Sequence, residues 1–249
     1  MRWFCFLLVA SPPTAGAQSA TAKTLHFDLT AIPATRDSFV FRFHGSERGW
    51  AVWQYEIRPR ETTQQVVYSA SSEFRPVEEE RMRVVLDRVT GAPISTFHRL
   101  ELFSPQSDTV MMEHDLAVAH GAITGRRRTG TKSGDVQIAP VDRSFAPGTV
   151  LGDYVLIAGA VTNAEPGDSL AAPAYKEFAD SLVTLSVVGE RPARIRVPAG
   201  WFDVEQLRSG NFRIFATRTP PRRVVKGETL DQAFSFELVH SGPVIPSEE

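Results

Sequence analysis

Histidines and acidic residues are the side chains most able to do chemistry, and one small group of them lies close together in the sequence. His114 and Asp115 are adjacent and His120 follows, so these three are the candidates for a hydrolase with an unusual site. Neighbouring residues of a strand point to opposite faces, and the apolar residues 110–112 just before them favour a strand. We therefore expect polar residues at the surface or at a strand end here rather than metal ligands. No catalytic triad or metal-site spacing links the histidines, which stand at positions 26, 44, 98, 114, 120 and 240.

The sequence lacks the other familiar catalytic signatures. It contains no G-x-S-x-G elbow, G-x-x-x-x-G-K-[ST] loop, H-E-x-x-H helix or EF-hand loop. Residues 78–80 are three glutamates, but consecutive acids do not provide the spaced oxygen ligands of a cation site. Residues 132–134 read Lys-Ser-Gly without the S-x-x-K motif that would accompany them in a penicillin-binding protein. We expect neither enzymatic activity nor a cofactor or metal.

Aromatic residues give a more informative pattern. Six of them alternate along neighbouring predicted strands and are expected to share one face: Phe27, Phe39, Phe41, Phe43, Trp53 and Tyr55. Such a face is either the core of the domain or, if the sheet is curved and not fully covered, the lining of an apolar pocket. Aromatic residues near turns could meet a ligand at the rim of that pocket. The candidate ligand-binding residues are Trp50, Trp53, Trp201 and Phe202.

The first 17 residues have the pattern of a cleavable secretory signal peptide. Arg2 precedes an apolar stretch at 3–10, and residues 15–17 form a small-residue A-x-A cleavage site. The apolar stretch is too short to cross roughly 30 Å of hydrocarbon. We expect cleavage after Ala17 and a mature protein in the periplasm or outside the cell, with no transmembrane segment.

Cleavage would also remove Cys5, the only cysteine of the chain. The mature protein could then form neither an internal disulfide nor a thiolate metal site, so a large hydrophobic core must stabilise it. The formal net charge is −2, with acidic and basic residues interspersed. This distribution gives no electrostatic reason to expect either nucleic acid or acidic lipid as a partner.

Apolar residues recur with a period of two along most of the chain, which predicts strands. A turn at 87–93, with Asp87 at its start and Gly91 near its end, predicts a hairpin between 81–86 and 94–103. The three arginines 126–128 lie between glycines, which favours a solvated turn. The other strands are predicted at 25–29, 39–43, 50–57, 65–71, 109–113, 116–124, 136–139, 183–188, 193–197, 202–208, 211–217, 223–226 and 233–240.

Two segments depart from this period. Leu151, Tyr154, Val155 and Ala158 have the spacing of one helical face, which predicts a short helix over about 149–160. Residues 173–182 fit either a helix or a strand.

The chain contains no repeat or clear interdomain linker. We expect a polar leader at 18–23, one β-rich domain at 24–240 and a disordered tail at 241–249. The expected fold class is all-β: a mainly antiparallel, strongly curved sheet or partial barrel with one or two short helices.

The segment Val-Pro-Ala-Gly-Trp-Phe-Asp-Val at 197–204, followed by 211–215 and by Pro-Pro-Arg-Arg-Val-Val at 220–225, resembles the C-terminal half of a family of exported bacterial β proteins of unknown function. In that family a V-P-A-G-x-F-D turn joins two strands, and a P-R-x-V/L-V strand comes later. The hairpin at 86–93 is similar to its N-terminal half, although less specifically, and Trp201 replaces a small polar residue. The resemblance implies a half-barrel fold similar to periplasmic lipoprotein carriers, and it implies no catalytic residues.

Two functions are consistent with these patterns. The first is non-enzymatic binding of a lipid, another apolar ligand or an envelope component by the curved sheet. The alternative is an interaction module that docks to another envelope protein through an exposed sheet edge. A packed interior together with a long uncovered edge strand would favour the alternative, whereas an open apolar interior would favour the first.

Overall fold

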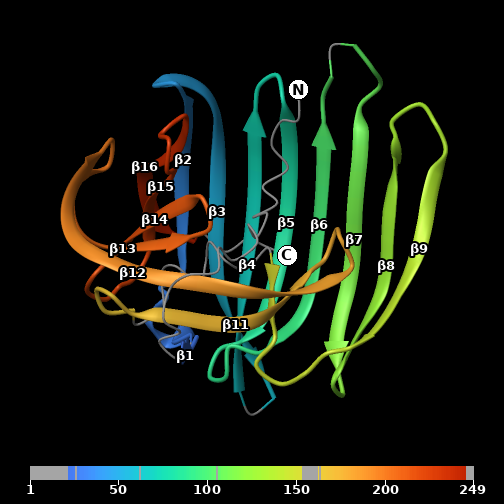
Figure 1. Cartoon of the computed structure of the whole chain (residues 1–249), viewed down its shortest axis with the longest axis horizontal. Coiled ribbons are helices and arrows are strands. Elements are labelled where there is room, and N and C mark those ends of the chain that lie inside the picture. The colour runs from blue at the N-terminus through green and yellow to red at the C-terminus, as the bar shows by residue number, and fades with distance from the viewer. Residues whose placement is uncertain are drawn as a thin grey trace, which may run out of the picture.

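A computed structural model describes residues 22–25, 27–61, 63–104, 106–152, 162 and 164–244. In this part of the chain, 16 strands form one strongly curved sheet (Figure 1). The helical element that accompanies them is the 3₁₀ helix η1 (Leu29–Ala31). The predicted all-β, mainly antiparallel fold is therefore confirmed. No helix of the described residues is long and apolar enough to cross a membrane.

Eight consecutive strands form a tall antiparallel wall in which each strand pairs with the next along the chain. They are β2 (Thr35–Phe43), β3 (Ser46–Arg60), β4 (Thr63–Phe74), β5 (Glu78–Asp87), β6 (Pro93–Leu102), β7 (Val110–Ala119), β8 (Ala122–Thr131) and β9 (Val136–Ser144).

The second half of the sheet continues from the opposite side of β2, where β16 pairs with β2 antiparallel. Its strands are β11 (Ser169–Lys176), β12 (Ser181–Val197), β13 (Gly200–Ser209), β14 (Phe212–Thr217), β15 (Val224–Thr229) and β16 (Phe234–Pro243). Two short strands, β1 (Lys23–Thr24) and β10 (Val150–Leu151), pair parallel with β11.

The turns between wall strands show why the chain forms hairpins here. Asp87 Oδ1 accepts hydrogen bonds from the backbone of Val89 (3.1 Å) and Thr90 (2.8 Å). Gly91 then takes a φ of +69°, which glycine adopts without strain. The predicted hairpin between β5 and β6 is thereby confirmed.

The sheet curls so that the β11–β12 hairpin crosses the concave side of the wall (Figure 1). The pairing of β12 with β13 shifts register between Glu190 and Ala193, which is a bulge of the kind that bends strands. The turn of this hairpin, residues 177–180, reaches the inner faces of β6, β7 and β8. The two ends of the curved sheet therefore approach each other.

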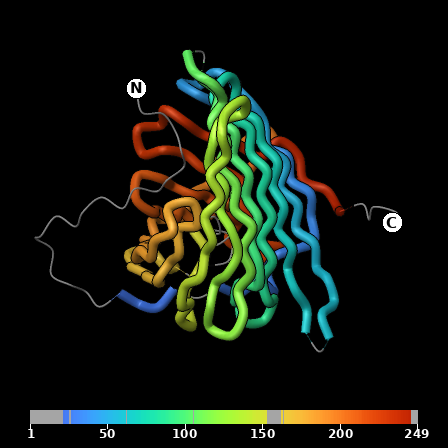
Figure 2. The backbone as a smooth tube through the Cα atoms, turned by 90° about the vertical axis from the view of Figure 1, so that its right-hand side faces the viewer, coloured from blue at the N-terminus to red at the C-terminus, as the bar shows by residue number. Residues whose placement is uncertain are grey.

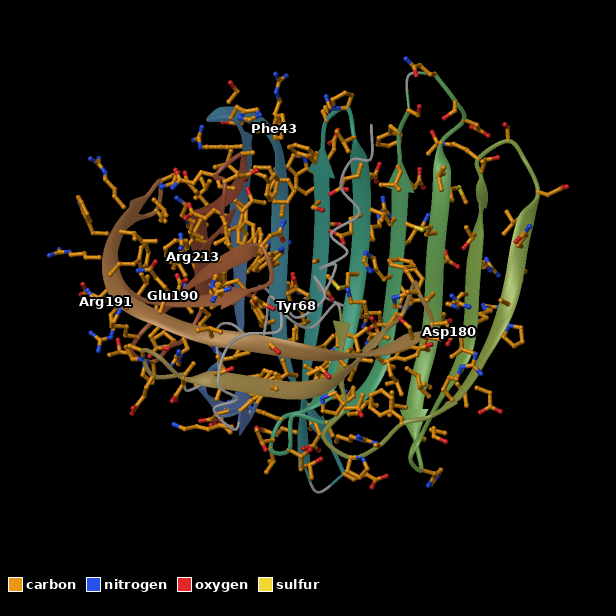
Figure 3. All side chains as sticks on the ribbon, viewed as in Figure 1. Phe43, Tyr68, Asp180, Glu190, Arg191 and Arg213 are labelled. Carbon is orange, nitrogen blue, oxygen red and sulfur yellow. The ribbon has the colours of Figure 1, made fainter. Side chains whose placement is uncertain are left out.

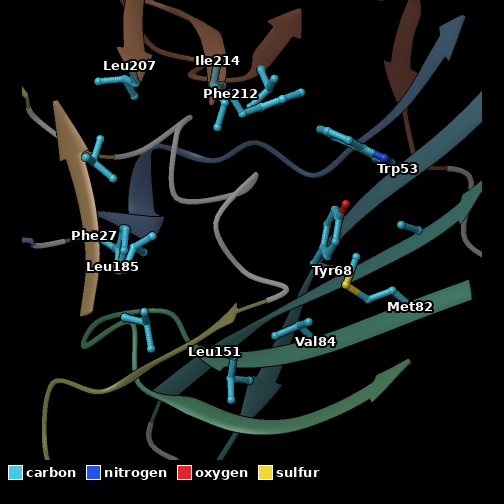
Figure 4. Close-up of a cluster of buried hydrophobic side chains, with 14 of the residues drawn as sticks. Phe27, Trp53, Tyr68, Met82, Val84, Leu151, Leu185, Leu207, Phe212 and Ile214 are labelled. Carbon is cyan, nitrogen blue, oxygen red and sulfur yellow. The ribbon is translucent and has the colours of Figure 1, made fainter. Parts of the chain in front are cut away.

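Aromatic side chains fill the concave side. Phe39 and Trp53 lie with ring centroids 4.4 Å apart, and Phe41 and Phe234 lie 5.6 Å apart. Figure 4 shows Trp53 and Tyr68 from the wall facing Phe212 and its neighbours from the opposite strands. All six residues of the predicted aromatic face belong to this core or pack against it. Where the structure describes it, this face is a packed core.

Several local predictions were wrong because long-range pairing overrides local pattern. Val150 and Leu151, at the start of the predicted helix, form strand β10 beside β11. Residues 153–160 of that prediction lie outside the described residues. For residues 173–182, where both a helix and a strand were open, the strand alternative is confirmed at 173–176 and 181–182, with a turn between them. The three arginines 126–128 belong to strand β8 rather than to a turn.

The predicted boundaries of the leader and tail also need correction. Residues 241–243 extend strand β16 and pair with residues 35–37 of β2. Ser241 Oγ donates a hydrogen bond of 2.5 Å to the buried carboxylate of Asp37, which holds this end of the strand in place. At the other end Lys23, assigned to the leader, belongs to β1.

Candidate functional site

The four predicted ligand-binding aromatics do not come together at one rim. Trp53 is 4% exposed and lies in the core, and Phe202 is half-buried against the same core. Trp50 and Trp201, by contrast, are 46% and 59% exposed. The spacing explains this split, because Trp201 and Phe202 are adjacent on β13 and must face opposite sides. Ligand binding by these residues stays a prediction.

The candidate hydrolase residues also diverge. His114 is fully buried on the inner side of β7, whereas Asp115 is exposed on the outer side. His120 lies in the turn after β7, with a φ of +51°. These three side chains therefore do not converge into one acid–base site.

His114 instead joins a buried cluster on the concave side. It stands opposite His98 on β6, with ring centroids 5.6 Å apart. The ring of Phe178, in the β11–β12 turn, lies 4.6 Å from His98 and 4.9 Å from His114. His98 Nε2 is 2.7 Å from Glu80 Oε1, and Ser72 donates to the other oxygen of Glu80 at 3.1 Å. Through Phe178, the turn of the β11–β12 hairpin packs against this cluster.

The acidic run 78–80 divides between the two faces of β5. Glu78 is buried, and burial raises its pKa to about 8, with a further rise from Glu80 and an opposing effect of His98. Glu79, by contrast, pairs with Arg81 on the outer face at 3.5 Å. A carboxyl group with a pKa near 8 is largely protonated at neutral pH.

A set of ionic contacts fastens the hairpin turn to the far strands of the wall, and we call it the clasp. Asp180 accepts hydrogen bonds from Tyr175 Oη (2.7 Å), Arg127 Nη2 on β8 (3.2 Å) and Arg143 Nη2 on β9 (3.0 Å). Arg127 Nη1 also donates to the carbonyl of Phe178 at 2.9 Å. Figure 3 shows Asp180 lying over this part of the wall.

The pKa of Asp180 reflects two opposing effects. Burial raises it, but the hydrogen bonds from Tyr175 and Arg143 and the charges of Arg127 and Arg143 outweigh burial and hold it below 3.8. The clasp thus favours the ionised carboxylate. Among the described residues, no group of three or more His, Cys, Asp or Glu side chains is arranged to hold a metal ion.

The exposed edge of the wall is the feature most suited to binding another molecule. Strand β9 pairs with β8, and no other described strand pairs with it. Figure 2 views the molecule from this side, with β9 in yellow-green nearest the viewer. A strand with one free side presents unpaired backbone N–H and C=O groups.

The register identifies which residues of β9 direct those groups outward. Phe145 N donates to Gly121 O at 2.7 Å, just beyond the last β8–β9 pair. Backbone groups alternate along a strand, so odd-numbered residues face β8 and even-numbered residues face outward. Pro140, which has no N–H, is even-numbered, as expected for a proline on an edge strand. Val136 and Ile138 therefore present free N–H groups.

The two halves of β9 differ in how well they are protected. The lower half carries Pro140, Asp142 and Arg143, and Arg143 is held in the clasp. The upper half, residues 136–139, has no charge, and its side chains Val136 and Ile138 are 46% and 61% exposed. A depression of about 100 Å³ beside it is lined by Arg99, Met111, Met112, Glu113, Arg128, Gly130 and Val136.

The sequence suggested docking through an exposed sheet edge but did not identify the strand, although one signal pointed to β9. Proline has no backbone N–H to donate and is therefore confined largely to edge strands within sheets. Pro140 directly follows the predicted strand 136–139, so a continuation of that strand through Pro140 would indicate an edge. The clasp and the buried histidine pair left no comparable signal, because their members are distant in sequence.

No family model matches the chain, and the search of curated proteins found no match. Among solved structures it is similar to a β-barrel-like protein of the domain of unknown function DUF1849 from Brucella abortus. The identity is 10%, the match covers 90% of this chain and 100% of that chain, and the TM-score is 0.46. The resemblance to periplasmic lipoprotein carriers and the family assignment stay predictions.

Proposed function

We propose that the protein is an exported, non-enzymatic interaction module that binds an extended segment of a partner protein along the upper half of β9. The observation that supports this most is the free edge at Val136 and Ile138, where outward backbone N–H groups lie beside exposed apolar side chains. Natural proteins normally protect such edges with charges, prolines or bulges. Only the lower half of β9 carries that protection.

The chemistry of the edge favours a peptide strand as the occupant. A row of backbone donors and acceptors is complemented by the backbone of another strand, and neighbouring hollows select its alternate side chains. The depression beside Val136 has Met111 and Gly130 in its lining, so it suits an apolar side chain. Arg99 and Arg128 at the same depression already pair with Glu101 (2.7 Å) and Glu113 (3.4 Å), so the depression selects for an apolar side chain rather than for a charge.

Binding of a lipid by the concave face has less support. The rings that would line a cavity are instead packed on one another, as in the pairs Phe39–Trp53 and Trp53–Phe236, with centroids 4.4 and 5.2 Å apart. Well-packed rings leave little space for an acyl chain.

The proposal of export rests on the signal-like pattern of the first 17 residues. If residues 1–17 are removed on secretion, the mature protein should begin at Gln18. Intact-mass analysis of protein recovered from a secreting host should give that mass. Retention of residues 1–17 in the exported fraction would contradict this part of the proposal.

A peptide-display selection tests the edge even though the partner is unidentified. The probe is a library of random unstructured peptides, and the immobilised protein should enrich sequences with apolar residues at alternate positions. On addition of an enriched peptide, amide exchange measured by NMR should slow at Val136 and Ile138. The amides of Gln137 and Ala139, which already face β8, should change little. If the peptide slowed amide exchange at other strands but not at β9, the proposal would be contradicted.

A further inference from the structure

A second exposed surface lies far from β9, on the hairpin that joins β12 to β13. The two strands are connected by Pro198 and Ala199, and the hairpin projects on the opposite side of the molecule from β9 (Figure 1). Arg196 pairs with Trp201 across the two strands. Ile195 and Phe202 take the inner positions and pack against the core. The outer face of the hairpin is therefore free for contact.

An exposed tryptophan and exposed arginines occupy that outer face. Trp201 is 59% exposed, and the guanidinium carbon of Arg194 lies 5.5 Å from the centroid of its ring. Arg196 is exposed beside them. Arg218 is also exposed, and its backbone N–H donates to the carbonyl of Asp203, the residue opposite Arg194. We call the set Arg194, Arg196, Trp201 and Arg218 the hairpin face.

The positive charge of the hairpin face is not neutralised by ion pairs. Within the part of the chain that the structure describes, none of its three arginines lies within 4.0 Å of a carboxylate. Arg208 and Arg213 further along the sheet show the contrast, because both pair with Glu190, at 3.3 and 2.6 Å. Asp203, which is exposed on the same face opposite Arg194, offsets one of these charges without an ion pair. The hairpin face therefore keeps an excess of positive charge for an anionic partner.

We propose that the hairpin face docks the protein on a membrane surface of anionic phospholipid. Guanidinium groups bind phosphate oxygens through paired hydrogen bonds. An indole ring, with an apolar body and a polar N–H, is suited to the headgroup region of a bilayer. Three arginines without ion pairs, beside an exposed tryptophan, supply both components. Because the hairpin face and β9 lie on opposite sides, a membrane-docked molecule would hold its binding edge away from the lipid.

Vesicle binding by the purified protein tests this proposal. The probes are vesicles of equimolar phosphatidylglycerol and phosphatidylcholine, with vesicles of phosphatidylcholine alone as the neutral comparison. We expect binding to the anionic vesicles and much weaker binding to the neutral ones. Since each basic residue near an anionic surface contributes about 1 kcal/mol, the double variant R194S/R196S should bind about 30-fold more weakly.

A charge-matched control separates this surface from the net charge of the protein. The variant R81S/R126S removes two exposed arginines from the wall and should bind as the wild type does. The emission of Trp201, obtained as the difference between the wild type and W201F, should shift to shorter wavelength on the anionic vesicles. The proposal would be overturned if the two double variants lost the same affinity for anionic vesicles, or if R194S/R196S bound them as tightly as the wild type. It would also be overturned if the emission wavelength of Trp201 did not change on the vesicles.

Discussion

Arg127 and Asp180 lie 53 positions apart in the chain, and their side chains meet with Nη2 3.2 Å from Oδ2. Arg143 reaches the same carboxylate from the neighbouring strand at 3.0 Å. Through this clasp, the β11–β12 hairpin is joined to β8 and β9 by side chains, where the described strands form no backbone ladder. The curvature of the sheet therefore depends in part on charged groups.

Replacing Asp180 by asparagine should lower the free energy of unfolding by about 1.5–3 kcal/mol, the usual contribution of a hydrogen bond to a charged group. The pKa of Asp180 is held below 3.8 in the folded protein. A carboxyl group with a depressed folded pKa stabilises the fold above its unfolded pKa, and that contribution disappears as pH falls through the folded pKa.

Denaturant titrations at pH 7 and at a pH of about 3 should therefore show a large difference between wild type and D180N at neutral pH and a smaller one in acid. Asp142, an exposed residue of the same edge strand as Arg143, provides the control, and D142N should have little effect. A D180N effect that is the same at both pH values would contradict an ionic clasp.

Glu78 should give the opposite pH dependence. Its folded pKa of about 8 exceeds its ordinary value of 4.5, so its contribution to stability is complete below pH 4.5 and is lost as pH rises to 8. Between those limits, the stability of the wild type relative to E78Q should fall by about 1.4 kcal/mol per pH unit.

The measurement is the difference in unfolding free energy between wild type and E78Q at several pH values, which cancels groups common to both proteins. Glu80 and His98 face the same carboxyl and are retained in both. The matched control is E79Q, because Glu79 lies on the outer face. A difference for E78Q that does not change with pH would show that the carboxyl is solvated.

Gly227 leaves room for two rings of the core. A Cβ placed on it would lie 2.3 Å from Phe236 Cε1 and 2.8 Å from Phe212 Cε1, and those rings stack with centroids 6.0 Å apart. Gly227→Ala should destabilise the protein by about 1–3 kcal/mol, as overpacked core positions do.

Thermal unfolding measures this effect. Gly242→Ala is the comparison, because a Cβ there would lie nearest to the flexible side chain of His240, at 3.3 Å. Equal melting temperatures for G227A and wild type would mean that the aromatic core has spare volume, which would restore support for an internal apolar ligand.

The strand-rich fold was predictable because period-two patterns and the turn at Asp87 and Gly91 are local signals. Elements that depend on partners distant in the sequence were not predictable in this way. Val150 and Leu151 belong to a segment with helical spacing, but they form a strand because they pair with Ala174 and Tyr175 of β11. The three consecutive arginines of β8 have the composition of a solvated turn. The sequence does not reveal that Arg127 has a partner in Asp180.

Part of the candidate site could also have been inferred from the sequence. Trp50 and Trp53 are an odd number of positions apart in one strand, so their side chains must face opposite sides of the sheet. Pro140 indicated an edge strand. The protection of the lower half of β9 depends on Arg143 contacting Asp180, and that contact follows only from the folded chain.

The edge-binding proposal has its most direct test in a matched pair of substitutions at Ile138. Ile138→Pro removes an outward N–H while leaving the hydrogen bonds between β8 and β9 in place, and Ile138→Ala keeps the N–H but shortens the side chain. The measurement is the dissociation constant of a display-selected peptide for each variant, with thermal unfolding to confirm that both remain folded. We predict at least about a tenfold loss for I138P, because a donor is lost and the ring clashes with an added strand, and a smaller loss for I138A. Undiminished binding by a folded I138P would contradict strand addition at β9.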